Sequence, residues 1–158
     1  MPAVFLGLIN NIALLVALSV VHGLIVRHSR QSTLLYQFFS GVLFGVVGVV
    51  GMLNALVLAP GLIFDGRSII LGVAGLFGGP LSAAVAALIC AAHRYALGGI
   101  GTLMGIGVIA ESALLGVGYH YLRRVRPDWV RPLHLYIFGT LVHLVMLAMM
   151  LLVPGGMS

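Results

Sequence analysis

The stretch SIILGVAGLFGGPLSAAVAALICAAHRYAL, residues 68–97, decides how the chain is organised. Its 30 residues would make about 45 Å of continuous helix, too long for one crossing of a hydrocarbon layer about 30 Å thick and too short for two full crossings. Gly78-Gly79-Pro80 interrupts the stretch near its middle. Proline is favoured at the first position of a helix, so the triplet predicts a turn between two short helices, 68–78 and 80–97.

The composition predicts a membrane protein. Of the 158 residues, 61% are hydrophobic and only 7% are charged, whereas soluble domains carry about 25% charged residues. The apolar runs are continuous rather than alternating, which favours helices over a β-barrel. We therefore expect an all-α compact bundle of six transmembrane segments, at residues 3–26, 34–58, 68–78, 80–97, 102–122 and 133–153.

Glycine spacing gives a weaker indication of helix packing. Small residues let membrane helices approach closely, which suits a chain with 22 glycines. GxxxG spacings occur at Gly41/Gly45, Gly75/Gly79 and Gly101/Gly105. With so many glycines some of these matches arise by chance, so each predicts a helix contact only weakly.

The arginines set the expected orientation. The chain has no lysine, and its two basic loops are RHSR at 27–30 and RRVRPDWVR at 123–131. The positive-inside rule places both loops on the cytoplasmic side, so an even number of segments must separate them. Only the interpretation of 68–97 as two segments meets this requirement. Both ends of the chain and the segment FDGRSI, residues 64–69, then lie on the extracytoplasmic side.

This orientation brings two arginines to one end of the bundle. Arg67 begins the descending segment, and Arg94 lies near the end of the ascending one, close to Asp65 and the Gly98-Gly99 turn. Short segments interrupted by glycine and proline indicate binding sites in membrane proteins. Two forked guanidinium groups suit a carboxylate or a phosphate. The alternatives are an Arg94 that only extends to the interface and an Asp65–Arg67 ion pair with a structural role.

Glu111 is a further candidate because it lies deep in its segment. It is roughly 14 Å below Thr102, and a carboxylate at that depth must be protonated or paired. Arg94 and His143 are the candidate partners, and a structural clasp and a ligand contact both remain open. Asn54 is expected to line the same outward pocket, with interhelical hydrogen bonding as the alternative.

The sequence shows no pattern typical of catalysis or of metal binding. His93, His120 and His134 lack the spacing of metal ligands, and no nucleophile motif or phosphate-binding loop occurs. We therefore expect neither an enzyme nor a bound cofactor or metal. The basic residues cluster at segment ends, so they indicate topology and not nucleic-acid binding.

Residues 60–105, PGLIFDGRSIILGVAGLFGGPLSAAVAALICAAHRYALGGIGTLMG, resemble the core of the LytS/YhcK-type transmembrane receptor domain. This is the five-transmembrane LYT sensor family of bacterial histidine kinases and diguanylate cyclases. The matching elements are Asp65 with Arg67, the turn that ends at Pro80, and Arg94 with Gly98-Gly99. HRYALGG is similar to the kinase branch, and FDGRS is similar to the cyclase branch.

The resemblance implies a multi-pass sensor of the bacterial inner membrane. Such a domain binds a small extracytoplasmic ligand, here a carboxylate or a zwitterion, and acts as a homodimer on a cytoplasmic signalling module. Any kinase or cyclase activity would belong to that module. Family members usually have a further span, so we expect residues 1–158 to be a single sensor domain cut before a final helix. The alternative is a substrate-binding subunit of an energy-coupling-factor-like importer of small solutes.

Overall fold

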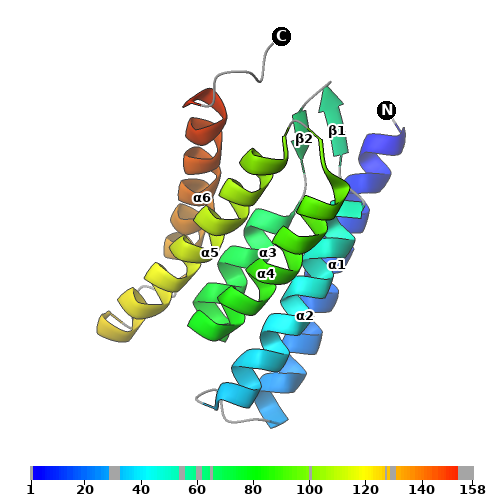
Figure 1. The fold of residues 1–158 in the computed structure, drawn as a ribbon. Helices are drawn as coiled ribbons and strands as arrows, with labels where there is room; N and C mark the ends of the chain where they lie inside the picture. The colour runs from blue at the N-terminus through cyan, green and yellow to red at the C-terminus, as the bar shows by residue number, and fades with distance from the viewer. Residues whose placement is uncertain are drawn as a thin grey trace.

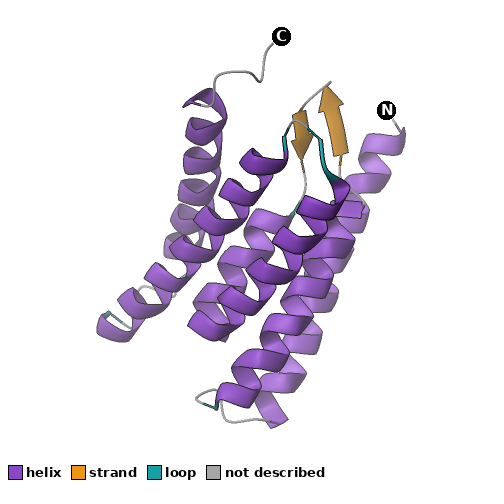
Figure 2. Cartoon of the chain, viewed as in Figure 1, coloured by secondary structure: helices purple, strands orange, loops and turns teal. Residues whose placement is uncertain are grey.

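The computed structural model describes residues 2–28, 33–53, 56–59, 62–64, 66–99, 101–126, 128 and 131–152. These residues are almost entirely helical, as Figure 2 shows. The elements are α1 (Pro2–His28), α2 (Leu34–Leu53), β1 (Leu56–Ala59), β2 (Leu62–Phe64), α3 (Arg67–Val73), the π-helical segment η1 (Ala74–Gly78), α4 (Pro80–Leu97), α5 (Thr102–Val125) and α6 (Pro132–Leu152).

The helices lie side by side in one bundle (Figure 1). α2 packs mainly on α4, α4 and α3 pack on α5, and α1 and α6 lie at the two sides. The end that carries β1 and β2, the start of α3 and the last turn of α4 is called the strand end below. The opposite end carries Arg123, Arg124, Arg126 and Arg131 and is called the basic end.

The prediction of a helical membrane protein is confirmed. Three of the described helices, α2, α4 and α5, are long and apolar enough to cross a membrane. Their outward positions are apolar as well, since Leu88, Leu103 and Leu114 are 70–84% exposed. Side chains of this kind suit contact with lipid rather than with water. The buried core lies inside, between α2, α3, α4 and α5, and includes Phe44, Ile70, Leu71, Ala86, Cys90 and Ile109.

Glycines bring the central helices into close contact. A β-carbon placed at Gly41 or at Gly45 of α2 would come within 2.7 Å of side chains on α4. A β-carbon at Gly75 would come 2.7 Å from the backbone of Gly116 on α5. These positions admit only glycine without a shift of the neighbouring helix, so two of the three GxxxG spacings coincide with helix contacts.

The second helix is shorter than the sequence predicts, and a short strand pair follows it in the otherwise helical chain. α2 ends at Leu53, and residues 56–59 form a strand that pairs antiparallel with β2, with Leu56 opposite Phe64. Pro60 and Gly61 stand between the two strands in the sequence and are a typical turn pair. The branched residues on either side favour a strand, so hydropathy alone overestimates the helix.

α3, η1 and α4 together form a helical hairpin whose bend lies towards the basic end (Figure 1). Gly79 has a φ of 88°, a backbone conformation that glycine adopts readily, and Pro80 is the first residue of α4. Two neighbouring helices hold this bend. The Leu81 N–H donates to Gln37 Oε1 of α2 at 3.3 Å, and His120 Nδ1 of α5 donates to the Leu76 carbonyl at 3.0 Å.

Candidate ligand-binding site

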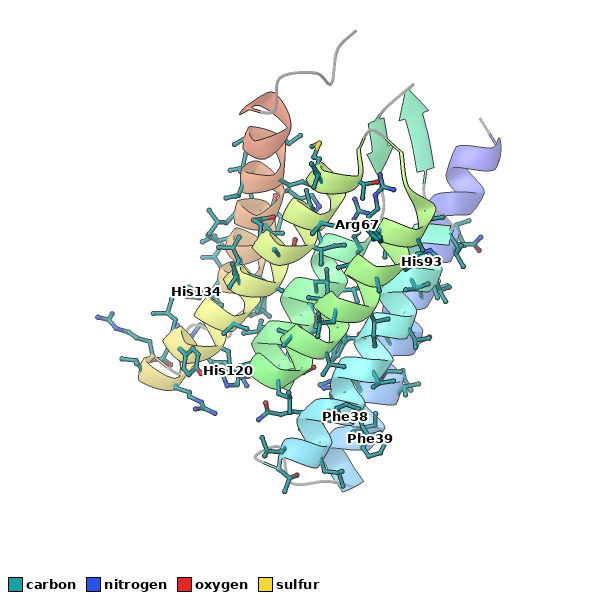
Figure 3. The ribbon with its side chains drawn as sticks, viewed as in Figure 1. Phe38, Phe39, Arg67, His93, His120 and His134 are labelled. Carbon is teal, nitrogen blue, oxygen red and sulfur yellow. The ribbon has the colours of Figure 1, made fainter. Side chains whose placement is uncertain are left out.

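Arg67 and Arg94 lie at the strand end of the bundle. Arg67 is the first residue of α3, and Arg94 lies in the last turn of α4. Because α3 and α4 are the antiparallel legs of one hairpin, both residues lie at its open end (Figure 1). Figure 3 shows Arg67 among the helices just below the two strands. Both side chains are half-buried.

The Arg94 side chain is held in place by the turn that follows α4. Its Nη1 donates to the Gly98 carbonyl at 2.9 Å. The side chain lies on the start of α5, where a β-carbon at Gly105 would come 2.6 Å from Nε and 3.0 Å from Cδ, and one at Gly101 would come 3.3 Å from Nη2. The guanidinium therefore lies over the Gly101–Gly105 face of α5 and points toward the strand end.

The predicted ligand residues Gly98 and Gly99 shape this turn. Their φ angles are 65° and 91°, so both adopt a backbone conformation that suits glycine. The Gly98 carbonyl accepts the hydrogen bond from Arg94. The Gly99 carbonyl accepts a hydrogen bond from the hydroxyl of Thr102, the first residue of α5, at 2.8 Å. The two glycines thus position Arg94 and connect α4 to α5.

Arg67 contacts α2 across the bundle. Its Nη1 donates to Met52 Sδ at 3.5 Å, a weak acceptor for a guanidinium. Two other predicted site residues, Asp65 and Asn54, lie outside the residues that the structure describes. The choice between a structural Asp65–Arg67 ion pair and a ligand contact therefore stays a prediction.

Glu111 lies deeper in the bundle than Arg94 and in different surroundings. It is six residues beyond Gly105 on α5, about 9 Å further from the strand end. Its Oε2 accepts from the Ser112 hydroxyl at 3.4 Å, and its Oε1 is buried without a hydrogen-bond partner among the described residues. It also interacts electrostatically with His143 of α6. No ion pair joins Glu111 to Arg94 in the described part of the chain.

Of the two partners considered for Glu111, His143 is thus the one with which it interacts electrostatically. Its Nδ1 donates to the Gly139 carbonyl at 2.8 Å, which orients the ring on α6. Ser112 is fully buried on α5, and Ser68 of α3, also buried, donates weakly to Met146 Sδ of α6 at 3.8 Å. The structure therefore separates the predicted residues into an arginine site at the strand end and a deeper polar cluster between α5 and α6.

Sequence reasoning missed the role of Gly105. The Gly101/Gly105 spacing indicates a helix contact, but these glycines make room for the Arg94 side chain instead. Among the described residues, the ion pair between Arg131 and Asp128, at 3.5 Å, lies at the basic end on exposed side chains. Such a pair contributes little to stability.

Comparison with known families identifies the chain. Residues 18–156 match the family described as 5TMR of 5TMR-LYT, which covers most of the chain. No curated protein and no solved structure matches it. The match includes the arginine site, the helical hairpin and the deeper polar cluster. The chain therefore belongs to the 5TMR-LYT family, the transmembrane sensor domain of signalling proteins.

Proposed function

We propose that this domain binds a small extracytoplasmic carboxylate between Arg67 and Arg94 and reports its presence to a cytoplasmic signalling module. The observation that carries the proposal is the setting of Arg94. The Gly98 carbonyl accepts a hydrogen bond from its guanidinium, and Gly101 and Gly105 leave room for it, at the end of the bundle where α3 begins with Arg67.

The chemistry of Arg94 supports an anionic ligand. A guanidinium has five N–H donors, and the Gly98 carbonyl takes one of them. No acidic side chain pairs with Arg94 in the described part of the chain. A carboxylate can accept two parallel hydrogen bonds from such a group, and these bonds strengthen where water is scarce. We assign a second acceptor of the ligand to Arg67, which begins the other leg of the hairpin at the same end.

The distribution of charge supports an outward-facing site. Four arginines lie at the basic end, which the positive-inside rule assigns to the cytoplasm. The strand end then faces the extracytoplasmic side. In this orientation the chain has six membrane segments, of which α3–η1 is the shortest, and is a multi-pass protein of the bacterial inner membrane.

The depth of Glu111 favours a simple carboxylate over a zwitterion. The Arg94 guanidinium points toward Gly98 and Gly101, away from Glu111, which lies about 9 Å deeper than Gly105. The ammonium and carboxylate groups of an α-amino acid are attached to the same carbon, so one such ligand would not span both sites. Glu111 then stabilises the packing of α5 against α6.

The hairpin is the element through which binding would act. A ligand that bridges Arg67 and Arg94 ties the start of α3 to the end of α4. Gln37 and His120 hold the other end of the same hairpin, near the basic end. Binding shifts a conformational equilibrium only if the ligand prefers one arrangement of these legs. A homodimer would carry that change to the signalling module.

Isothermal titration calorimetry on the chain in lipid nanodiscs tests the proposal. The ligand panel consists of mono- and dicarboxylates, 2-oxo acids and amino acids. We expect saturable binding of a carboxylate, weakened about tenfold or more by Arg67→Gln and by Arg94→Gln, because each removes charged hydrogen bonds. Arg131→Gln, an exposed arginine at the basic end, is the matched control.

Two outcomes would contradict the proposal. Carboxylate affinity that is unchanged in both arginine variants would move the site elsewhere. Saturable binding of an uncharged solute, with uptake into vesicles when an ATPase pair is present, would favour an importer subunit instead.

A further inference from the structure

A half-open cavity of about 250 Å³ lies between α1, α2 and the α3–η1 segment. None of its described lining residues belongs to the arginine site or to the polar cluster around Glu111. Four of them come from one face of α1, and the opposite wall carries Val73 of α3 and Phe77 of η1. The cavity therefore separates α1 from the hairpin at the point where α3 becomes π-helical.

Aromatic rings form much of the wall. The His22 and Phe44 rings lie with centroids 5.0 Å apart, tilted by 56°. Phe77 faces the same space, and the Arg123 guanidinium lies 5.4 Å from the centroid of its ring. Both His22 and Phe77 are thus held by neighbours. Aromatic walls favour an aromatic occupant through tilted or offset ring contacts.

The polar groups of the wall limit the chemistry of that occupant. Ser19 and His22 are the polar residues among those that line the cavity. The Ser19 hydroxyl donates its proton to the Leu15 carbonyl at 2.8 Å, so its oxygen is left to accept. His22 Nε2 shares a hydrogen bond with the Tyr36 hydroxyl at 2.9 Å. The described lining residues carry no charge, so a charged ligand would lose its hydration without compensation.

We propose that this cavity is a second binding site, for an uncharged aromatic molecule of one or two rings with one N–H or O–H donor. The donor pairs with Ser19 Oγ, and the rings pack against Phe44, His22 and Phe77. Size agrees with this class, because a dry cavity of roughly 150 Å³ lined by similar side chains holds benzene. The volume here leaves room for a second fused ring.

A ligand in the cavity would restrict the motion of the hairpin at its bend. Phe77 lies in η1, beside the Leu76 carbonyl that His120 holds. π-Helical segments often occur at functional sites. A ligand packed against Phe77 would restrain η1 from the α1 side, while the carboxylate acts on the same hairpin from its open end.

Equilibrium dialysis of radiolabelled indole against the full chain in lipid nanodiscs tests the site, with empty nanodiscs subtracted for partitioning into lipid. We expect saturable binding of one indole per chain. Leu15→Phe fills the cavity from α1 and should weaken binding about tenfold or more. Val16→Phe, at the next position and 59% exposed, is the matched control and should bind as the unmodified chain does.

A second variant tests the hydrogen bond and does not depend on a change of side-chain volume. Ser19→Ala should weaken indole binding about fivefold, the effect of one neutral hydrogen bond. Binding of benzofuran, which has the same shape and no donor, should not change. Arg94→Gln should leave indole binding intact, so failure of this site and failure of the carboxylate site are distinguishable.

Three results would overturn the proposal. The first is uptake no greater than that of empty nanodiscs. The second is indole affinity unchanged by both Leu15→Phe and Ser19→Ala. The third is a phospholipid retained by the unmodified chain, lost from Leu15→Phe and not displaced by indole, as seen by native mass spectrometry. That result would assign the cavity to an acyl chain.

Discussion

Replacing Gly105 with alanine should separate ligand binding from stability. The new methyl group would sit 2.6 Å from Arg94 Nε and 3.0 Å from Cδ. A comfortable contact is about 3.5 Å or longer, so the Arg94 side chain must move by about 1 Å. Binding groups need to be held within about 0.5 Å of their productive position. The displaced guanidinium should therefore lose its match to the carboxylate.

The substitution should affect carboxylate affinity much more than the free energy of unfolding. A hydrogen bond to a charged group contributes about 1.5–3 kcal/mol, so losing one should lower carboxylate affinity roughly 10- to 150-fold. Stability should change little, because a long flexible side chain can move. Alanine also favours a helix interior over glycine by up to about 1 kcal/mol. We expect the free energy of unfolding to change by less than about 1 kcal/mol.

Calorimetry measures the affinity, and thermal melting in the same nanodiscs measures the stability. Gly118→Ala is the matched control, since Gly118 lies on the same helix and a β-carbon there meets nothing within 4 Å. That variant should keep both properties. If Gly105→Ala binds the carboxylate as tightly as the unmodified chain, the described position of Arg94 has no part in recognition and the reasoning is refuted.

Other substitutions test the packing and the polar contacts. Gly116→Ala places a methyl group against the backbone of α3, which cannot rotate away, and should destabilise the bundle by about 2 kcal/mol or more in thermal melting, whereas Gly118→Ala should not. His120→Phe leaves the buried Leu76 carbonyl without its donor and should cost about 1–3 kcal/mol; unchanged melting and unchanged hydrogen exchange at η1 would contradict this role. Glu111→Gln should change carboxylate affinity by less than about threefold in calorimetry, because Glu111 lies about 9 Å deeper than Gly105, and a tenfold loss would return Glu111 to the ligand site.

Part of the candidate site could be predicted from the sequence, because chain direction determines which residues share an end. A helical hairpin with its bend between Gly79 and Pro80 returns Arg94 to the level of Arg67 whatever the side chains do. The sequence also groups Glu111 with this pocket, and that grouping depends on more than chain direction. Depth along a helix is readable from residue counting, but the direction in which a side chain points depends on the rotation of its helix against its neighbours.

The strands show a second limit of sequence reasoning. Hydropathy measures the free energy of transfer into an apolar medium and does not distinguish a helix from a strand in an apolar run. The prediction therefore extends this helix to residue 58. In the structure α2 ends at Leu53, and β1 pairs with β2. Branched residues favour a strand in this segment, and the pairing of β1 with β2 decides it.

The sequence by itself determined that this chain is a helical membrane protein with a bent helical pair. Composition, the positions of glycine and proline and the placement of arginine are enough for this, because each acts through local free energies that add up along the chain. The tertiary structure alone decided that Gly105 makes room for Arg94, that Glu111 lies near His143, and that His22 and Phe77 face a common cavity. Each of these depends on how two distant helices are rotated and packed, and close packing of irregular side chains is a property of the assembled bundle.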